Sequence, residues 1–273
     1  MQPDPAVATT LAPMRRRPSL LRRTQEIWLP VVVIAVLVML WEIACRVFAV
    51  PGYLLPSPSA IWAETWQMRK QVLVHGEATL ITVLAGFLVS VAISLPLAVA
   101  LTASRTIANA IYPVLILTQS IPKVALAPIL VVLLGANELP RIVITFLIAF
   151  FPLVLSCAAG LLAVPPELME LGRACKASRW QELTRIRLPF AMPFVFSGLK
   201  AAIALAVVGA VVAEFVNADR GLGYMIISAT AFFKVPLAWG ALILLSIMGI
   251  VLFQVVVVIE RILVPWSNGN EKA

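Results

Sequence analysis

Long apolar stretches separated by short polar ones organise this chain. The stretch from Ala78 to Thr102, for example, has 25 residues and no charged side chain. About 20 apolar residues suffice for a helix to cross the hydrocarbon core of a bilayer. Inside a bilayer the backbone must satisfy its own hydrogen bonds, which a helix does within one segment. The pattern therefore predicts an all-α polytopic membrane protein.

Six transmembrane helices are expected from this pattern, with both termini on the cytoplasmic side. They cover about residues 27–48, 78–102, 107–137, 141–164, 194–216 and 236–263. Together they form one transmembrane domain, residues 27–265, between a cytoplasmic N-terminal tail of residues 1–26 and a cytoplasmic tail of residues 266–273. The N-terminal tail is basic, as positive-inside anchors are. A cleaved signal peptide is disfavoured, because the apolar run that follows is too long and no small-residue cleavage site comes after it.

The third span is interrupted by Pro122, Lys123 and Pro128. The stretch from 106 to 137 is too long for one straight span and too short for two spans with a turn. Basic segments favour the cytoplasmic side. The N-terminal tail and the basic segment 165–189 both lie on that side only if an even number of spans separates them. Counting 106–137 as one span gives an even number, whereas counting it as two gives an odd number, so we expect one broken span.

Irregular backbone at membrane depth is tolerated only where it is buried in protein or lines a cavity. Gln119 and Ser120 lie just before the break, which Pro122 marks. These three residues are therefore candidates for a translocation path, with a packing kink as the alternative. Glu214, near the outer end of the fifth span, is a second candidate, as an outer gate or as a partner of a basic residue such as Arg220. The alternative for Glu214 is an interfacial carboxylate without a transport role.

Several shorter features are also expected. Glu42 and Arg46 are four residues apart with the acid first, so they can pair on one helix face. A helix that lies in the membrane interface is expected to start near Pro56–Ser59. Lys200 lies near the inner end of the fifth span, where its ammonium can snorkel. Gly221 and Gly223 are expected to form a turn.

One polar segment, Pro165–Pro189, stands between the fourth and fifth spans, and we call it the polar loop. It reads PPELMELGRACKASRWQELTRIRLP and holds five of the 21 Lys and Arg residues of the chain. Proline suits the first turn of a helix, and Glu167 lies where the helix dipole favours an acid. Ser178 followed by Gln181 is typical of a capping box. We expect two short helices with a bend near Ala177, ending where Pro189 stops the second.

Composition narrows the function. The chain is 62% hydrophobic and 12% charged, far from the roughly 25% charged residues of a soluble domain. The net charge of +8 resides in clusters between apolar runs, which indicates topology signals and contacts with anionic lipids rather than nucleic acid. Three cysteines without close spacing and a single histidine indicate neither a disulfide framework nor a metal site. No cofactor is expected to be bound by this chain.

At the polar loop the sequence resembles the EAA loop of binding-protein-dependent ABC importer permeases, whose pattern is E-A-A, three residues, G, nine residues, I-x-L-P. Glu170 matches the acid, and Ile186, Leu188 and Pro189 match the end. Leu171 and Gly172 replace the alanines, and Lys176 stands at the glycine. Since lysine lacks the easy access of glycine to positive φ, either the bend is expected to differ in shape or the groove of the ATPase is expected to be less tightly filled.

The resemblance extends over about residues 28–264 to the nitrate/sulfonate/taurine-type branch of these permeases. It is carried by short matches in the same order and spacing: Trp41-Glu42, Leu55-Pro56-Ser57-Pro58, Ala177-Ser178-Arg179-Trp180, Pro193, Gly198-Leu199, Glu214 and Gly221-Leu222-Gly223-Tyr224. The resemblance implies a type I ABC importer permease in the bacterial cytoplasmic (inner) membrane, for a sulfonate, taurine, nitrate or a similar small solute. Pyrimidine-type vitamin precursors are the alternative within the family.

The chain has no G-x-x-x-x-G-K-[ST] sequence, so it lacks a phosphate-binding loop of that kind, and it is not expected to be an enzyme. The resemblance implies two copies of a separate ABC ATPase, a second copy of the permease as a homodimer, and an external solute-binding protein. The residues implied to contact the ATPase are Glu167, Glu170, Leu171, Gly172, Arg173, Ala174, Lys176, Ala177, Ser178 and Trp180. An ion-coupled secondary transporter or channel is the alternative of another class, and it would need ionisable residues near mid-membrane.

Overall fold

The computed structural model describes residues 20–103 and 105–266, and these residues form helices and no strand. The all-α prediction is confirmed. Of the tails expected over 1–26 and 266–273, residues 1–19 and 267–273 lie outside the described residues, whereas residues 20–26 form the first turns of a helix. The described residues divide into two units, one up to Val50 and the other from Pro51 onward.

The first unit is the helix α1 (Leu20–Val47) with the short turn after it. Its apolar side chains from Trp28 to Leu40 are exposed. Arg46 lies 2.6 Å from Glu42, and the predicted pair is therefore confirmed.

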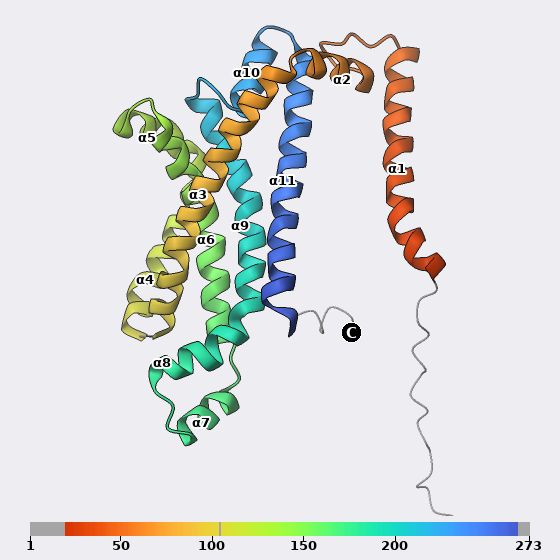
Figure 1. The fold of residues 1–273 in the computed structure, drawn as a ribbon. Helices are drawn as coiled ribbons and strands as arrows, with labels where there is room; N and C mark the ends of the chain where they lie inside the picture. The colour runs from red at the N-terminus through yellow and green to blue at the C-terminus, as the bar shows by residue number, and fades with distance from the viewer. Residues whose placement is uncertain (1–19, 104, 267–273) are drawn as a thin grey trace, which may run out of the picture. The chain divides into compact units, whose positions relative to one another are not determined.

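The second unit contains the remaining helices, and its two ends are easily told apart in Figure 1, with α2 and α10 at one end and α7 and α8 at the other. The helices are α2 (Pro58–Gln67), α3 (Arg69–Ala103), α4 (Arg105–Gln119), η1 (Lys123–Leu126), α5 (Ala127–Leu134), α6 (Glu138–Leu162), α7 (Pro166–Ala174), α8 (Arg179–Glu182), η2 (Leu183–Arg187), α9 (Leu188–Val216), α10 (Leu222–Ala231) and α11 (Val235–Leu263).

The core of this unit is α6 packed between α3 and α9. Small residues let the helices approach closely, as in membrane bundles generally. A Cβ on Gly209 of α9 would lie 2.9 Å from Cα of Thr145, and one on Gly86 of α3 would clash with the Thr145 side chain. Ser90 donates a hydrogen bond to the carbonyl of Phe146 at 3.2 Å. The backbone of α6 is thus held directly against α3 and α9.

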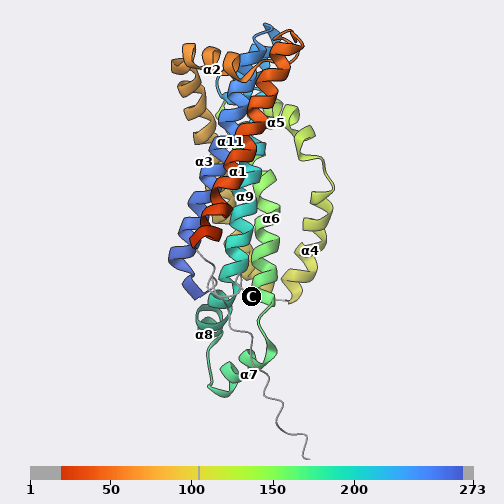
Figure 2. The ribbon, with the colours of Figure 1, turned by 90° about the vertical axis from the view of Figure 1, so that its right-hand side faces the viewer.

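Five of the described helices are long and apolar enough to cross a membrane, and the bent pair α4–α5 brings the number to six. In this pair Thr106–Gln119 and Lys123–Leu134 meet at 84°. The break expected at Pro122 is therefore present, and Figure 2 shows the chain turning between α4 and α5.

One helix begins earlier than the span predicted within it, and one predicted helix end is wrong. The second span was expected from Ala78, but α3 begins at Arg69, because Lys70, His75 and Glu77 are accommodated in its first turns near the end of the unit. Pro189 does not stop the second loop helix. It occupies the first turn of α9, where the missing N–H of a proline costs nothing, and the helical path runs on.

Lys200 was expected to snorkel near the inner end of its span, and the sequence did not indicate a partner for it. It forms an ion pair with Glu260 at 3.0 Å, which links α9 to α11. Neither side chain is fully exposed, so the pair allows both charges to be accommodated in an apolar helix face.

Candidate functional site

The polar loop begins with α7, whose start follows from its sequence. Pro166 lies in the first turn, where no intrahelical N–H partner is lost, and Glu167 lies beside the positive end of the helix dipole. The helix runs only to Ala174, and its faces alternate between charged and apolar side chains.

Lys176 forms the bend after α7 in the left-handed conformation, with φ of 55°. The N–H of Ala177 donates to the carbonyl of Gly172 at 2.9 Å, and the N–H of Lys176 donates to that of Arg173 at 2.9 Å. These two bonds define a Schellman motif, which usually has glycine at the left-handed position. The expectation of a differently shaped bend is therefore wrong, because Lys176 adopts the positive φ itself.

The predicted capping box at the start of α8 is confirmed. The Ser178 hydroxyl accepts from the N–H of Gln181 at 3.3 Å, and the Gln181 side chain accepts from the N–H of Ser178 at 2.8 Å. The two short helices expected in the polar loop are both present, with the bend between them at the expected place.

Gly172 brings the two halves of the polar loop together. It is buried, and a Cβ at this position would lie 2.8 Å from Cδ1 of Ile186 in η2. The departure from alanine at this position therefore leaves room for the isoleucine that ends the motif. This contact sets the distance between α7 and η2, the turn that leads into the long helix α9.

The remaining predicted contact residues of the polar loop face outward, apart from the half-buried Ala177. Leu171 is 61% exposed and Trp180 is 71% exposed, which is unusual for such large apolar side chains. The charged and small residues around them are exposed as well, namely Glu167, Glu170, Arg173, Ala174, Lys176 and Ser178. The loop thus presents apolar side chains surrounded by charges, a surface suited to a protein partner.

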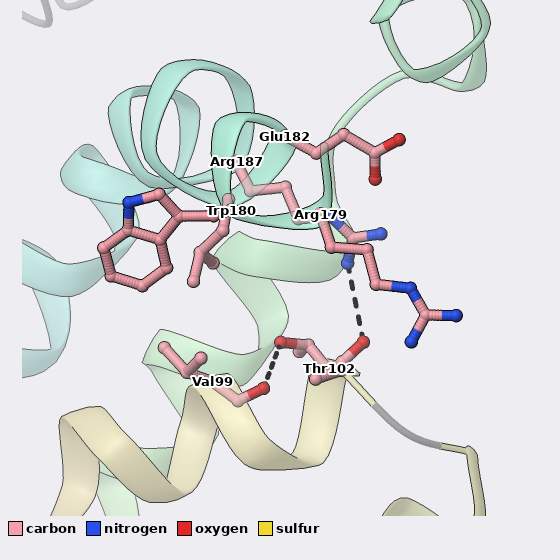
Figure 3. Close-up of a pocket in the computed structure, with 8 residues that line it drawn as sticks. Val99, Thr102, Arg179, Trp180, Glu182 and Arg187 are labelled. Carbon is pink, nitrogen blue, oxygen red and sulfur yellow. Dashed lines mark hydrogen bonds between the residues drawn. The ribbon is translucent and has the colours of Figure 1, made fainter. Parts of the chain in front are cut away.

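A cavity of about 290 Å³ lies between the polar loop and the C-terminal end of α3. Figure 3 shows the Trp180 ring on one side and the Arg187 guanidinium directed toward α3. Arg187 donates to the carbonyl of Thr102 at 3.5 Å, a long hydrogen bond across the cavity. Thr102 could not be identified as a partner from the sequence, since threonine is common in apolar helices.

The loop continues into the core without a break. From Arg179 to Val216 the chain is one run of 38 helical residues, made of α8, η2 and α9. Leu183–Arg187 is a π-helical turn, a wider turn that often marks functional positions. A displacement of α8 would therefore be passed directly to α9.

The predicted path residues fall into two separate groups. Gln119 ends α4, Ser120 follows it, and Pro122 precedes η1, all with exposed side chains. Glu214 lies elsewhere, buried in α9 at the α10 end of the unit. Among the described residues, no hydrogen bond joins the two groups.

Glu214 belongs to a set of side chains that bind the start of α10. Its carboxylate accepts from the N–H of Gly223 at 2.7 Å. The two preceding N–H groups are bound by α3: that of Gly221 donates to Nδ1 of His75 at 3.0 Å, and that of Leu222 donates to the Thr79 hydroxyl at 2.8 Å. Three successive N–H groups that lack helical partners are thereby satisfied.

Arg220, which was one possible partner of Glu214, does not pair with it. Arg220 pairs instead with Glu138 at 3.0 Å, because the glycine turn directs the N–H groups rather than the arginine toward Glu214. Sequence reasoning also missed His75 and Thr79. Their spacing of four residues places two polar groups on one face of a helix, and that signal could have identified them.

In the part of the chain that the structure describes, no group of three or more His, Cys, Asp and Glu side chains could hold a metal ion.

Comparison with known proteins gives a consistent result. The family described as "Binding-protein-dependent transport system inner membrane component" matches residues 90–268. The riboflavin transport system permease protein RibX of Chloroflexus aurantiacus is 35% identical over 88% of this chain and 90% of its own length. The formylaminopyrimidine transport permease protein ThiX of Halalkalibacterium halodurans is 32% identical over 91% of this chain and 99% of its own length.

The taurine transport system permease protein TauC of Escherichia coli is 25% identical over 90% of this chain and 92% of its own length, in agreement with the resemblance drawn from the sequence. Among solved structures, a chain of the MetNI methionine ABC transporter in an inward-facing conformation superposes with a TM-score of 0.63. It has 21% identity, over 70% of this chain and 95% of that chain, and so supports the fold.

Proposed function

The chain belongs to the binding-protein-dependent transport system inner membrane component family, and we propose that its polar loop is the surface through which an ATPase drives it. The protein is a multi-pass permease subunit of an ATP-driven ABC importer in the bacterial cytoplasmic membrane. It is not itself an enzyme, since the ATPase of such a transporter is a separate subunit.

The observation that carries the proposal is the construction of the polar loop. Leu171 and Trp180 are exposed although large and apolar, and α8 continues into α9 without a loop. A partner that binds these exposed side chains can therefore move α8 and α9 together as one rigid helix. The residues proposed to contact the ATPase are Glu167, Glu170, Leu171, Gly172, Arg173, Ala174, Lys176, Ala177, Ser178 and Trp180, with the buried Gly172 acting through the spacing of the two helices.

This role requires the polar loop to face the cytoplasm, where ATP is. We propose the topology with six spans and both termini inside, in which α4 and α5 form one broken span. The polar loop and the C-terminal end of α3 then lie on the cytoplasmic side, and α2 and α10 lie outside.

The partners implied by the family are an ATPase subunit and a solute-binding protein. We propose two ATPase copies and a permease homodimer. An apolar groove of about 700 Å³ along α9 and α11 supports the dimer, with Val211, Leu245 and Gly249 among the residues lining it. Gly249 leaves room for the close approach of another helix.

For the solute, we propose a sulfonate, taurine, nitrate or a similar small compound. A second candidate is a heterocyclic vitamin or vitamin precursor, because RibX and ThiX, whose names state riboflavin and formylaminopyrimidine, are more similar to this chain than TauC is.

Reconstitution tests the proposed function. The chain is placed in liposomes with its ATPase and binding protein, and uptake of taurine, nitrate, riboflavin and formylaminopyrimidine is measured with and without ATP. Uptake of one solute that needs both ATP and the ATPase is expected. Uptake that persists without the ATPase would instead support an ion-coupled transporter.

A further inference from the structure

Lys123 places a positive charge at the break of the α4–α5 pair. It is the first residue of η1, directly after Pro122. Its ammonium lies 4.3 Å from the centroid of the Phe151 ring, and Phe151 is close to the middle of the 25-residue helix α6. In the proposed topology the charge therefore lies near mid-membrane depth, in the region where the chain turns in Figures 1 and 2.

The aromatic ring holds this charge without neutralising it. Phe151 is buried and packs edge-on against Phe150, with ring centroids 5.0 Å apart, so its face offers a fixed surface to the ammonium. A ring attracts a cation through its quadrupole. It provides no counter-charge, and the ammonium keeps the capacity to bind an anion.

Two other charged groups that are not exposed in the described spanning helices, Lys200 and Glu214, have polar partners, whereas the interaction found for Lys123 is with the Phe151 ring. Lys200 pairs with Glu260 at 3.0 Å, and Glu214 accepts from a backbone N–H at 2.7 Å. Within the part of the chain that the structure describes, no carboxylate forms an ion pair with Lys123. A charge inside the membrane is costly, and such residues mark ion and solute pathways.

We propose that Lys123 binds the anionic group of the transported solute as the solute passes the break. The inference rests on the proposed function and deepens it, because it selects small anions such as sulfonates or nitrate over neutral heterocycles. The exposed Gln119 and Ser120 just before the break offer hydrogen-bond donors to the same anion. Phe151 holds the ammonium when no solute is bound.

The test uses the reconstituted transporter with taurine, nitrate, riboflavin and formylaminopyrimidine as probes. Lys123→Met removes the charge at similar length, and Lys123→Arg keeps it. Phe151→Leu removes the ring and keeps the charge. Lys234→Met is the matched control, since Lys234 is exposed at the start of α11. Membrane insertion and ATPase retention are measured for every variant.

The wild type is expected to import taurine or nitrate. Lys123→Met should lower the initial rate at least tenfold, whereas Lys123→Arg and Phe151→Leu should stay within threefold and Lys234→Met should match the wild type. Unchanged anion uptake by Lys123→Met overturns the role of Lys123. Import of riboflavin or formylaminopyrimidine alone also overturns it and leaves the importer assignment intact. ATP-independent uptake overturns the proposed function itself.

A cysteine variant keeps the test decisive if Lys123→Met inserts poorly. Lys123→Cys is made in a chain whose Cys45, Cys157 and Cys175 are replaced by serine. Aminoethyl methanethiosulfonate then restores an ammonium, and methyl methanethiosulfonate adds a neutral group of smaller size. Restoration of anion uptake by the first reagent alone supports the proposal, and equal effects of the two reagents contradict it.

Discussion

Gly172 and Ile186 set the spacing between the two halves of the polar loop, because a Cβ on Gly172 would lie 2.8 Å from Cδ1 of Ile186. The loop can bind a partner in one geometry only if α7 keeps this position against η2. The pair links a residue of the proposed ATPase contact to the first turns of the long helix that enters the core.

Gly172→Ala is expected to weaken coupling between ATP hydrolysis and uptake. The contacted atom is the end of a flexible side chain, so the cost should be modest, about 1–2 kcal/mol. Uptake per ATP hydrolysed should fall severalfold, and the double change Gly172→Ala with Ile186→Val should recover most of it. A single variant with wild-type coupling, or a double variant no better than the single one, would show that the spacing is unimportant.

Lys176→Gly should stabilise the polar loop by about 1 kcal/mol, since a left-handed conformation costs a non-glycine residue about that much. Amide hydrogen exchange over α7 measures the effect. The Lys176→Asn loop should be intermediate in stability between the wild type and Lys176→Gly, and the Lys176→Val loop should be less stable than the wild type. If the ATPase groove is adapted to the lysine, uptake should not improve in Lys176→Gly. A gain in coupled uptake would mean that the lysine weakens coupling to the native partner.

Ser178→Ala removes the hydroxyl half of the capping box and should destabilise the start of α8 by about 1 kcal/mol. The readout is faster amide exchange at Gln181, whose N–H loses its acceptor. Ser59→Ala serves as the control. Ser59 lies in α2, outside the polar loop, so this change should leave the exchange rate at Gln181 unchanged. Unchanged exchange in Ser178→Ala would mean that the capping box contributes nothing to α8.

Gly221→Ala should strongly destabilise the α10 end of the second unit. Gly221 has φ of 130°, and a Cβ there would clash with the Glu214 carboxylate. Strain and overpacking together predict a loss of about 3 kcal/mol or more. The melting temperature in detergent measures it. Gly76→Ala is the matched control, because a Cβ on Gly76 meets nothing within 4 Å and should be neutral or stabilising. Equal melting temperatures for both variants would contradict the Glu214 packing.

Much of the polar loop could be predicted from the sequence, because its signals are local. A proline start, a capping box and charges near helix ends act over a few residues, and both short helices formed as expected. Lys176 departed from expectation because the hydrogen bonds of the Schellman motif offset the cost of its backbone conformation.

The parts that could not be predicted depend on contacts between distant segments. The partner of Glu214 is a backbone N–H exposed by a turn, which no residue pattern reveals, and His75 and Thr79 reach that turn from another helix. Pro189 reads as a stop signal, yet the same proline is compatible with a helix start once the preceding turn is π-helical.

The central claim is that the exposed surface of the polar loop receives the ATPase. The most direct measurement is retention of the ATPase by purified Leu171→Asp, together with uptake in liposomes. Leu54→Asp is the control, because Leu54 is 65% exposed, similar to Leu171, and lies far from the polar loop in the sequence. We predict at least a tenfold loss of ATPase retention and of uptake for Leu171→Asp and near wild-type values for Leu54→Asp. Wild-type retention and uptake by Leu171→Asp would contradict the claim.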